Sequence, residues 1–343
     1  MRRRFPVLTA FGLIAAAALG VAQVPGVQEI NVYGLRKVAA ESVLQAAKLH
    51  SGEPLPRSKG DMEDAIEQVP GIVRARVEAI CCEGKNAVVF VGIEEREGPH
   101  VAFRQPPSGT ALLPAGMMEA YQQFLNALRR SGQQPRGEGR DPSLNGAEER
   151  FTVFAKGDLA AVREALRNGA EAEERAAAAI VIGYAPKKLE IMPDLQYALR
   201  DPDESVRSNA IRSLHASVVS DGNTAQGLPV PLGTLVELLQ SLVLSDRLEA
   251  ADLLVSLTDG GDQEPLTLMR ARALPALVEM ARWESLRYAI RPYILVGRIA
   301  GFSEKDIIQH WSDGEREQVI QKALALPKTP VPAAMSPSRK SGH

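Results

Sequence analysis

One pattern in the second half of this 343-residue chain constrains its fold more than any other feature. Four segments, starting at residues 174, 206, 246 and 286, carry an arginine at their second position and then apolar residues at helical spacing. The arginines lie 32, 40 and 40 residues apart: Arg175, Arg207, Arg247 and Arg287. Another amphipathic stretch precedes each segment. Helix pairs that recur at this period stack into an α-solenoid, so a solenoid is predicted here.

Small side chains in these segments agree with close helix packing. In the first three, an alanine follows the arginine by three residues, at Ala178, Ala210 and Ala250. Aromatic residues make up only 5% of the chain. This composition favours helices packed on helices over a large sheet.

The stretch LRDPDESVR, residues 199–207, indicates how one helix pair turns. Pro202 cannot continue the first helix, and Asp201 or Asp203 can accept hydrogen bonds from free N–H groups at the start of the second. We expect Arg207 to pair with these carboxylates across the turn.

The same stretch resembles the turn of a HEAT repeat, and the resemblance covers roughly residues 150–326. It implies a curved helical surface that binds partners, and by itself it implies no chemistry. Ser303 and Asp306 have the spacing of a helix cap and open the last helices, which would close the stack.

Residues 27–96 predict a strand, two helices and two strands. Residues 72–80 alternate apolar and polar side chains, whereas residues 87–93 are almost wholly apolar, as in a central strand. The motifs INVYG (30–34), LHSGEPL (49–55) and VPGIVRARVE (69–78), with Val91, Ile93 and Glu95, resemble a POTRA domain. Such domains occur in outer-membrane protein assembly factors, two-partner secretion transporters and FtsQ-type division proteins. The resemblance implies a three-stranded mixed sheet backed by two helices, with strand 72–80 at an edge.

An edge strand has unpaired N–H and C=O groups that another extended chain can join. The outward side chains of strand 72–80 are Arg74, Arg76 and Glu78, which are the candidate partner-binding residues. Two interpretations stay open: these charges block aggregation, or they select the peptide that docks there.

Cys81 and Cys82 are the only cysteines, so a framework of several disulfides and a cysteine-rich zinc site are both excluded. Successive strand side chains point to opposite faces. We therefore expect one buried and one exposed thiol, without a bond between them.

The first residues are typical of an export signal. Arg2, Arg3 and Arg4 precede an apolar run at residues 11–21, and small residues occupy positions 20 and 22 before Gln23. We expect cleavage after residue 22. The alternative is an uncleaved anchor over residues 5–22, slightly short of the ~20 apolar residues of a spanning helix. Either outcome places the rest of the chain outside the cytoplasm.

No motif in the sequence predicts a reaction. The five histidines are scattered, and no phosphate-binding loop, nucleophile elbow or dinucleotide fingerprint is present. We therefore predict no catalytic residue, no cofactor, no metal and no enzymatic activity. The formal net charge of −2 argues against a nucleic-acid partner.

The predicted fold class is α+β, mostly α: a POTRA-like βααββ domain followed by a HEAT-like α-solenoid. The expected order is a signal peptide (1–22), the POTRA-like domain (23–97), a connector with one docking helix at residues 117–130 (98–150), the helical repeats (151–326) and a disordered tail (327–343).

The expected function is an exported bacterial envelope scaffold that binds proteins without catalysis, through the edge strand and the repeat surface. Asp201, Pro202, Asp203 and Arg207 have a structural role in this hypothesis. Two alternatives are a membrane-anchored division or secretion subunit, which touches the membrane only through its uncleaved N-terminal segment, and a periplasmic enzyme with the connector as a lid.

Overall fold

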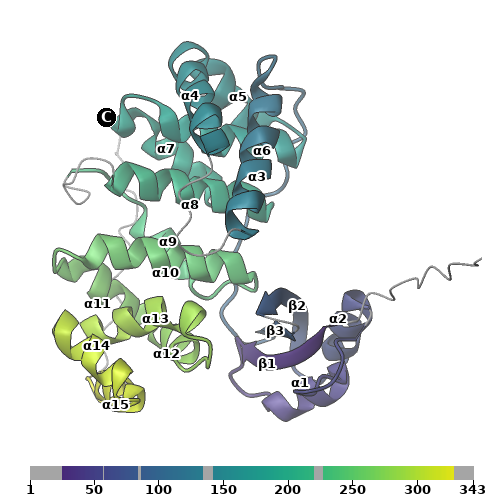
Figure 1. Cartoon of the computed structure of the whole chain (residues 1–343), viewed down its shortest axis with the longest axis vertical. Helices are drawn as coiled ribbons and strands as arrows, with labels where there is room; N and C mark the ends of the chain where they lie inside the picture. The colour runs from purple at the N-terminus through teal and green to yellow at the C-terminus, as the bar shows by residue number, and fades with distance from the viewer. Residues whose placement is uncertain (1–24, 57, 84–85, 134–141, 220–226, 328–343) are drawn as a thin grey trace, which may run out of the picture.

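The computed structural model describes residues 25–327 except 57, 84–85, 134–141 and 220–226. A small sheet domain lies beside a long stack of helices (Figure 1). The predicted fold class, α+β and mostly α with a helical solenoid, is confirmed. The signal peptide expected at residues 1–22 and nearly all of the tail expected at residues 327–343 lie outside the described residues.

The sheet has three strands in the order β1-β3-β2. The strands are β1 (Gly26–Tyr33), β2 (Ile72–Glu83) and β3 (Asn86–Glu95). β1 is parallel to β3 and β2 is antiparallel to it, so the sheet is mixed and β2 forms an edge, as expected. Ala87 to Ile93 of β3 are buried, because both faces of this central strand are covered.

Each face of the sheet packs against a different part of the chain. α1 (Ala40–Ala47) and α2 (Lys59–Glu67) cover one face, where Val89 and Val91 meet Val43 and Ile66. The other face belongs to the core of the helical half, where the ring of Phe90 lies 5.0 Å from that of Trp283 and 5.1 Å from that of Tyr288. The two faces of the sheet therefore contribute to two separate hydrophobic cores.

The helical half forms successive pairs. The first helices of the pairs are α5 (Leu159–Asn168), α7 (Lys188–Ala198), α9 (Leu232–Leu238), the broken pair α11 (Gln263–Arg272) and α12 (Leu274–Ala281), and α14 (Glu304–Ser312). The second helices are α6 (Ala172–Val181), extended by η1 (Ile182–Tyr184), then α8 (Glu204–Val219), α10 (Leu244–Thr258), α13 (Leu286–Ile299) and α15 (Arg316–Leu324). Each second helix packs on the next one along the stack.

Small residues allow this close stacking. Ala178, Ala210 and Ala250 are fully buried on α6, α8 and α10. A Cβ at Gly183 would lie 2.4 Å from Oγ of Ser213 and 3.1 Å from its Cα, so η1 approaches α8 too closely for any side chain there. At the far end, Oγ of Ser303 accepts a hydrogen bond from Asp306 N and caps α14, as its spacing predicts.

An extended segment, residues 98–114, joins β3 to α3 (Met117–Gln133), and we call it the strap. Arg104 N donates to the carbonyl of Arg200 at 2.8 Å, and Ala170 N donates to the carbonyl of Gly109 at 3.1 Å. The strap therefore runs along the turns of the first two helix pairs. α3, the helix expected at residues 117–130, packs with α4 (Pro142–Gly157) and α6 at the start of the stack (Figure 1).

One expectation about the cysteines is wrong. Cys81 is disulfide-bonded, whereas we expected two separate thiols. That expectation rested on the cost of bonding residues adjacent in sequence.

Candidate protein-interaction surfaces

Three arginines of the repeated segments are buried along the turn side of the stack. Arg175, Arg207 and Arg247 are each at most 2% exposed. Arg175 donates to both carboxylate oxygens of Asp201 at 2.9 Å, and Arg207 binds both oxygens of Asp246 at 2.8 to 3.1 Å. Arg247 reaches Oε2 of Glu279 at 3.3 Å. Each arginine thus binds an acid of the following pair, and we call this series the arginine ladder.

The guanidinium groups also close the turn before their own helix. Nη1 of Arg175 donates to the carbonyls of residues 169 and 170, and Nη1 of Arg207 to those of residues 201 and 202. Arg247 reaches the carbonyl of Ser241 through Nε. Buried charges are tolerated when they are paired and their remaining donors are satisfied, as they are here.

The expected pairing of Arg207 with the carboxylates of its own turn is wrong. One edge of its guanidinium is used by the carbonyls of that turn, so its Nε and Nη2 point to Asp246 of the next pair. Asp201 binds Arg175 of the preceding pair instead. Asp203 caps α8 as expected, because its Oδ1 accepts from Ser205 N at 2.9 Å. Pro202 stands in the turn between α7 and α8.

Aromatic rings from the N-terminal half cover two of these arginines. The ring of Phe103, in the strap, lies 3.9 Å from the guanidinium of Arg207, and the ring of Tyr33 lies 4.4 Å from that of Arg247. Such contacts are attractive, most of all where water is excluded. Gly34 N donates to both oxygens of Glu279 at 2.9 and 3.0 Å. The turn side of the stack is therefore occupied by the chain itself.

The edge of β2 is partly satisfied from within the domain. Ala75 N donates to Oε1 of Glu67 at 3.0 Å, and Val77 N donates to Oε1 of Glu63 at 2.7 Å. Both glutamates lie on α2. Two of the edge N–H groups that an added strand would need are thus already bonded.

The candidate residues of this strand face the helical half. Arg76 pairs with Glu78 and with Glu204 of α8, and Glu78 accepts from Leu244 N at 3.4 Å. Arg74 is more exposed and lies 3.5 Å from Glu94. Partner binding by Arg74, Arg76 and Glu78 stays a prediction, but Arg76 and Glu78 already bridge the two halves of this chain.

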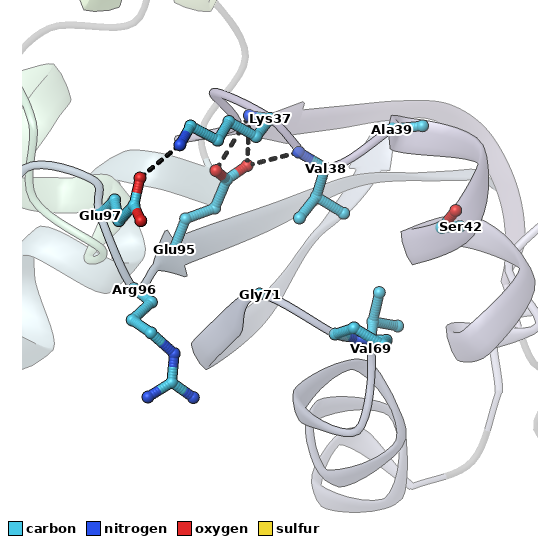
Figure 2. A pocket seen from close by; sticks show the side chains of 10 residues that line it. Lys37, Val38, Ala39, Ser42, Val69, Gly71, Glu95, Arg96 and Glu97 are labelled. Carbon is cyan, nitrogen blue, oxygen red and sulfur yellow. Dashed lines mark hydrogen bonds and ion pairs between the residues drawn. The ribbon is translucent and has the colours of Figure 1, made fainter.

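A hollow of about 400 Å³ lies beside the loop between β1 and α1 (Figure 2). Its central carboxylate, Glu95, is 5% exposed and accepts hydrogen bonds from the backbone N–H groups of Arg36, Lys37 and Val38. Burial raises the pKa of Glu95, but these N–H groups outweigh it and hold the pKa below its ordinary value. The carboxylate therefore fastens this loop.

A groove of about 390 Å³ lies on the second helices α8, α10 and α13. Ile211, Leu248 and Tyr288 give it apolar lining. Charged side chains also line it, and two ion pairs lie among them: Arg212 with Glu249 at 3.3 Å and Arg291 with Asp252 at 2.8 Å. Arg287 lines the same groove and has no ion pair with any described residue. Burial raises the pKa of Glu249, although Arg212 and Ser208 oppose this.

The profile of the HEAT repeat family matches residues 159–255, which span α5 to most of α10. These helix pairs are HEAT-like repeats. No curated protein matches the chain. Among solved structures, a designed armadillo repeat protein is similar at 16% identity and a TM-score of 0.31, covering 61% of this chain and 98% of its own. Stacked repeats present extended surfaces to protein partners, so the HEAT-like repeats support an interaction scaffold.

Two further findings concern the described residues alone. None of their helices combines the length and apolar character that a membrane crossing needs. No three of their histidine, cysteine and acidic side chains are placed to hold one metal ion.

Sequence reasoning missed the residues that join the strap and the sheet domain to the HEAT-like repeats. Phe103, Arg104 and Tyr33 have no repeat spacing, because each contacts a residue about 90 or more positions away. Glu279 carries the only local signal, since it follows Arg247 by 32 residues and so lies in the next pair.

Proposed function

We propose that this protein is an exported, non-catalytic scaffold of the bacterial cell envelope, and that it binds protein partners through its HEAT-like repeats. The observation that carries the proposal is the asymmetry of the stack. Its turn side is occupied by the strap and the sheet domain, while the groove on α8, α10 and α13 has no covering segment among the described residues.

The groove has the chemistry of a protein-binding surface. It combines an apolar lining with charged side chains, and interfaces commonly surround an apolar centre with a polar rim. The proposal places the main contact here, because Glu63 and Glu67 already bind two edge N–H groups of β2. The β2 edge, with Arg74, Arg76 and Glu78, is a second contact in this proposal.

Export rests on sequence features, and the POTRA-like assignment rests on sequence motifs together with the topology of the sheet. Arg2, Arg3 and Arg4 before an apolar run support export. The motifs at residues 30–34, 49–55 and 69–78, together with the β1-β3-β2 order and two covering helices, support a POTRA-like domain. The absence of a reaction motif in the sequence supports a non-catalytic role.

The test is affinity purification of the full chain from crosslinked cells of its native host, followed by identification of the attached proteins. We expect defined envelope proteins with the wild type and with Lys305→Glu, a charge reversal at an exposed position of α14. The double variant Arg287→Glu/Arg291→Glu changes the groove and should lose them. The proposal is wrong when no protein is captured, or when the groove variant captures the same proteins as the control.

Mass spectrometry of the N-terminus in the same preparation separates the export variants. A chain that starts near Gln23 supports a cleaved signal. An intact N-terminus in the membrane fraction supports the anchored subunit instead.

A further inference from the structure

A second hollow, of about 590 Å³, lies where the strap crosses the first helices of the repeats. We call it the Arg104 hollow. Its polar lining comes from the strap, from α5, from α7, from the residues after α7 and from Thr234 of α9. The residues that matter here are Arg104, Arg167, Tyr197 and Arg200. This site is separate from the groove on α8, α10 and α13, because the two share no lining residue.

Positive charge exceeds negative charge around this hollow. Nη2 of Arg104 lies 3.3 Å from Oδ2 of Asp201, but both oxygens of that carboxylate already bind Arg175 at 2.9 Å. Arg163 and Arg167 in turn share the carboxylate of Asp194, at 2.8 and 2.6 Å. Four arginines therefore share two carboxylates. Arg200 pairs with Glu237 and adds nothing to this excess.

Arg104 is the least satisfied of these arginines. Its Nε is buried and has no hydrogen-bond partner among the described residues. Burial lowers the pKa of Arg104, Tyr197 and Asp201 oppose this, and the nearby charges of Arg175 and Arg167 lower the pKa further. The Arg104 side chain as a whole is 25% exposed, and an accessible guanidinium with too few carboxylates nearby is suited to an added anionic acceptor.

Tyr197 holds two guanidinium groups in place at this site. Arg104 lies 3.3 Å from the centre of its ring and Arg167 lies 4.6 Å from it. The Tyr197 hydroxyl donates to the carbonyl of Arg167 at 3.2 Å, which fixes the ring against α5. Arginines that are held by stacking lose little freedom when they bind a carboxylate.

We propose that the Arg104 hollow binds carboxylate side chains of an acidic segment in a protein partner. The inference rests on the proposed scaffold function and adds the chemistry of one contact. Arginine forks match the geometry of carboxylates, and the hollow lies at the surface within reach of an extended segment. Arg104 and Arg167 supply the donors, while Tyr197 positions them.

The test uses the full chain and a fluorescein-labelled hexaglutamate peptide, with a hexaglutamine peptide as the neutral probe. Fluorescence anisotropy at low ionic strength should show saturable binding of hexaglutamate, and hexaglutamine should not bind. Arg167→Gln should weaken binding about tenfold, since it removes a donor of the hollow while Arg163 still pairs with Asp194. Arg104→Gln should weaken binding at least as much.

Arg282→Gln is the matched control, because it removes the same charge from another exposed, ion-paired arginine that neither lines the hollow nor contacts Asp194 or Asp201. Its affinity for hexaglutamate should stay within about twofold of the wild type. The proposal is overturned by absent or unsaturable hexaglutamate binding, or by an equal loss in Arg282→Gln and Arg167→Gln. It is also overturned when inorganic phosphate at an equal concentration of charge displaces the peptide, since that outcome indicates a free-anion site.

These outcomes are independent of the scaffold test. When crosslinked partners are captured equally by the wild type and Arg167→Gln and hexaglutamate does not bind, the scaffold function stands and this inference fails. When hexaglutamate binds but no partner is captured, the scaffold function fails.

Discussion

Arg207 and Arg287 occupy the same position in two similar sequence segments, yet they have opposite environments. Arg207 is 1% exposed and binds both oxygens of Asp246. Arg287 lies at the exposed start of α13 and has no ion pair with any described residue. The comparison teaches that an acid in the following pair is not enough, because α15 carries Glu317 but this glutamate pairs with Arg282 and not with Arg287.

The neighbouring residues show the same difference. Three positions after the arginine, Ala210 is fully buried, whereas Ile290 is half-buried in the fourth segment. A methyl group allows the second helices to approach closely, and a branched side chain keeps them farther apart. The arginine ladder therefore needs two things at each step: an acid of the following pair within reach of the arginine, and a small residue three positions after the arginine.

The largest expected effect is at the carboxylate of the ladder. Asp246→Ala leaves Arg207 buried without its partner and should lower the free energy of unfolding by about 3–5 kcal/mol. Asp252→Ala, on the same helix, removes a half-exposed partner of Arg291 and should cost at most about 1 kcal/mol. Denaturant unfolding measures both values. Equal losses in the two variants would break the comparison.

A larger side chain at the close contact between the second helices should have the next largest effect on the free energy of unfolding. Ala210→Ile copies the fourth segment into the second and should lower the free energy of unfolding by about 1–3 kcal/mol. Ala216→Ile makes the same change at an exposed position of α8 and should stay within about 0.5 kcal/mol of the wild type. Calorimetry can compare the two variants. If Ala210→Ile leaves the free energy of unfolding unchanged, helix spacing does not distinguish the second segment from the fourth.

The hydroxyl of Tyr33, the residue whose ring covers Arg247, should contribute less. Tyr33→Phe keeps the ring over Arg247 but loses the 2.8 Å hydrogen bond to the carbonyl of Leu242, at a cost of about 1 kcal/mol. Hydrogen exchange should rise in β1, because that bond joins the sheet to the repeats. Tyr293→Phe removes a hydroxyl bonded to the carbonyl of Ile307 and serves as the control, with β1 exchange unchanged. Unchanged β1 exchange in both variants would contradict this role.

The smallest effect is expected at the exposed arginine itself. Arg287→Ala should change the free energy of unfolding by less than about 0.5 kcal/mol, since its exposed side chain forms no ion pair with the residues that the structure describes. A loss as large as that of Asp246→Ala would mean that the fourth segment continues the ladder in solution.

Local patterns predicted most of the elements and part of the turn chemistry, but they missed α4, most of which lies in the expected connector, and α11. The spacing of the arginines predicted the helix pairs, and Asp203 caps α8 as its position suggested. The partner of Arg207 was not predictable from its own turn, because Asp246 lies 39 residues later and an equally good acid, Asp201, lies only six residues before it. Geometry decides between the two, since the carbonyls of the turn already use one edge of the guanidinium.

No sequence pattern predicted the contacts that the sheet domain and the strap make with the helical repeats. Glu78 predicted an outward face of β2, but nothing in the strand indicated that Leu244 N would meet it. The Arg104 hollow was equally hidden, because Arg104 lies in a segment without periodicity and meets Tyr197 only after the strap has crossed α7.

The packing of Phe90 against Trp283 and Tyr288 has a consequence for biosynthesis. Phe90 leaves the ribosome 198 residues before Tyr288, which at typical translation rates is a delay of roughly 10 to 40 seconds. Throughout that interval one apolar side of the nascent sheet faces water without its cover. A holding chaperone during translation would therefore matter more for this chain than for one whose domains complete their cores in order of synthesis.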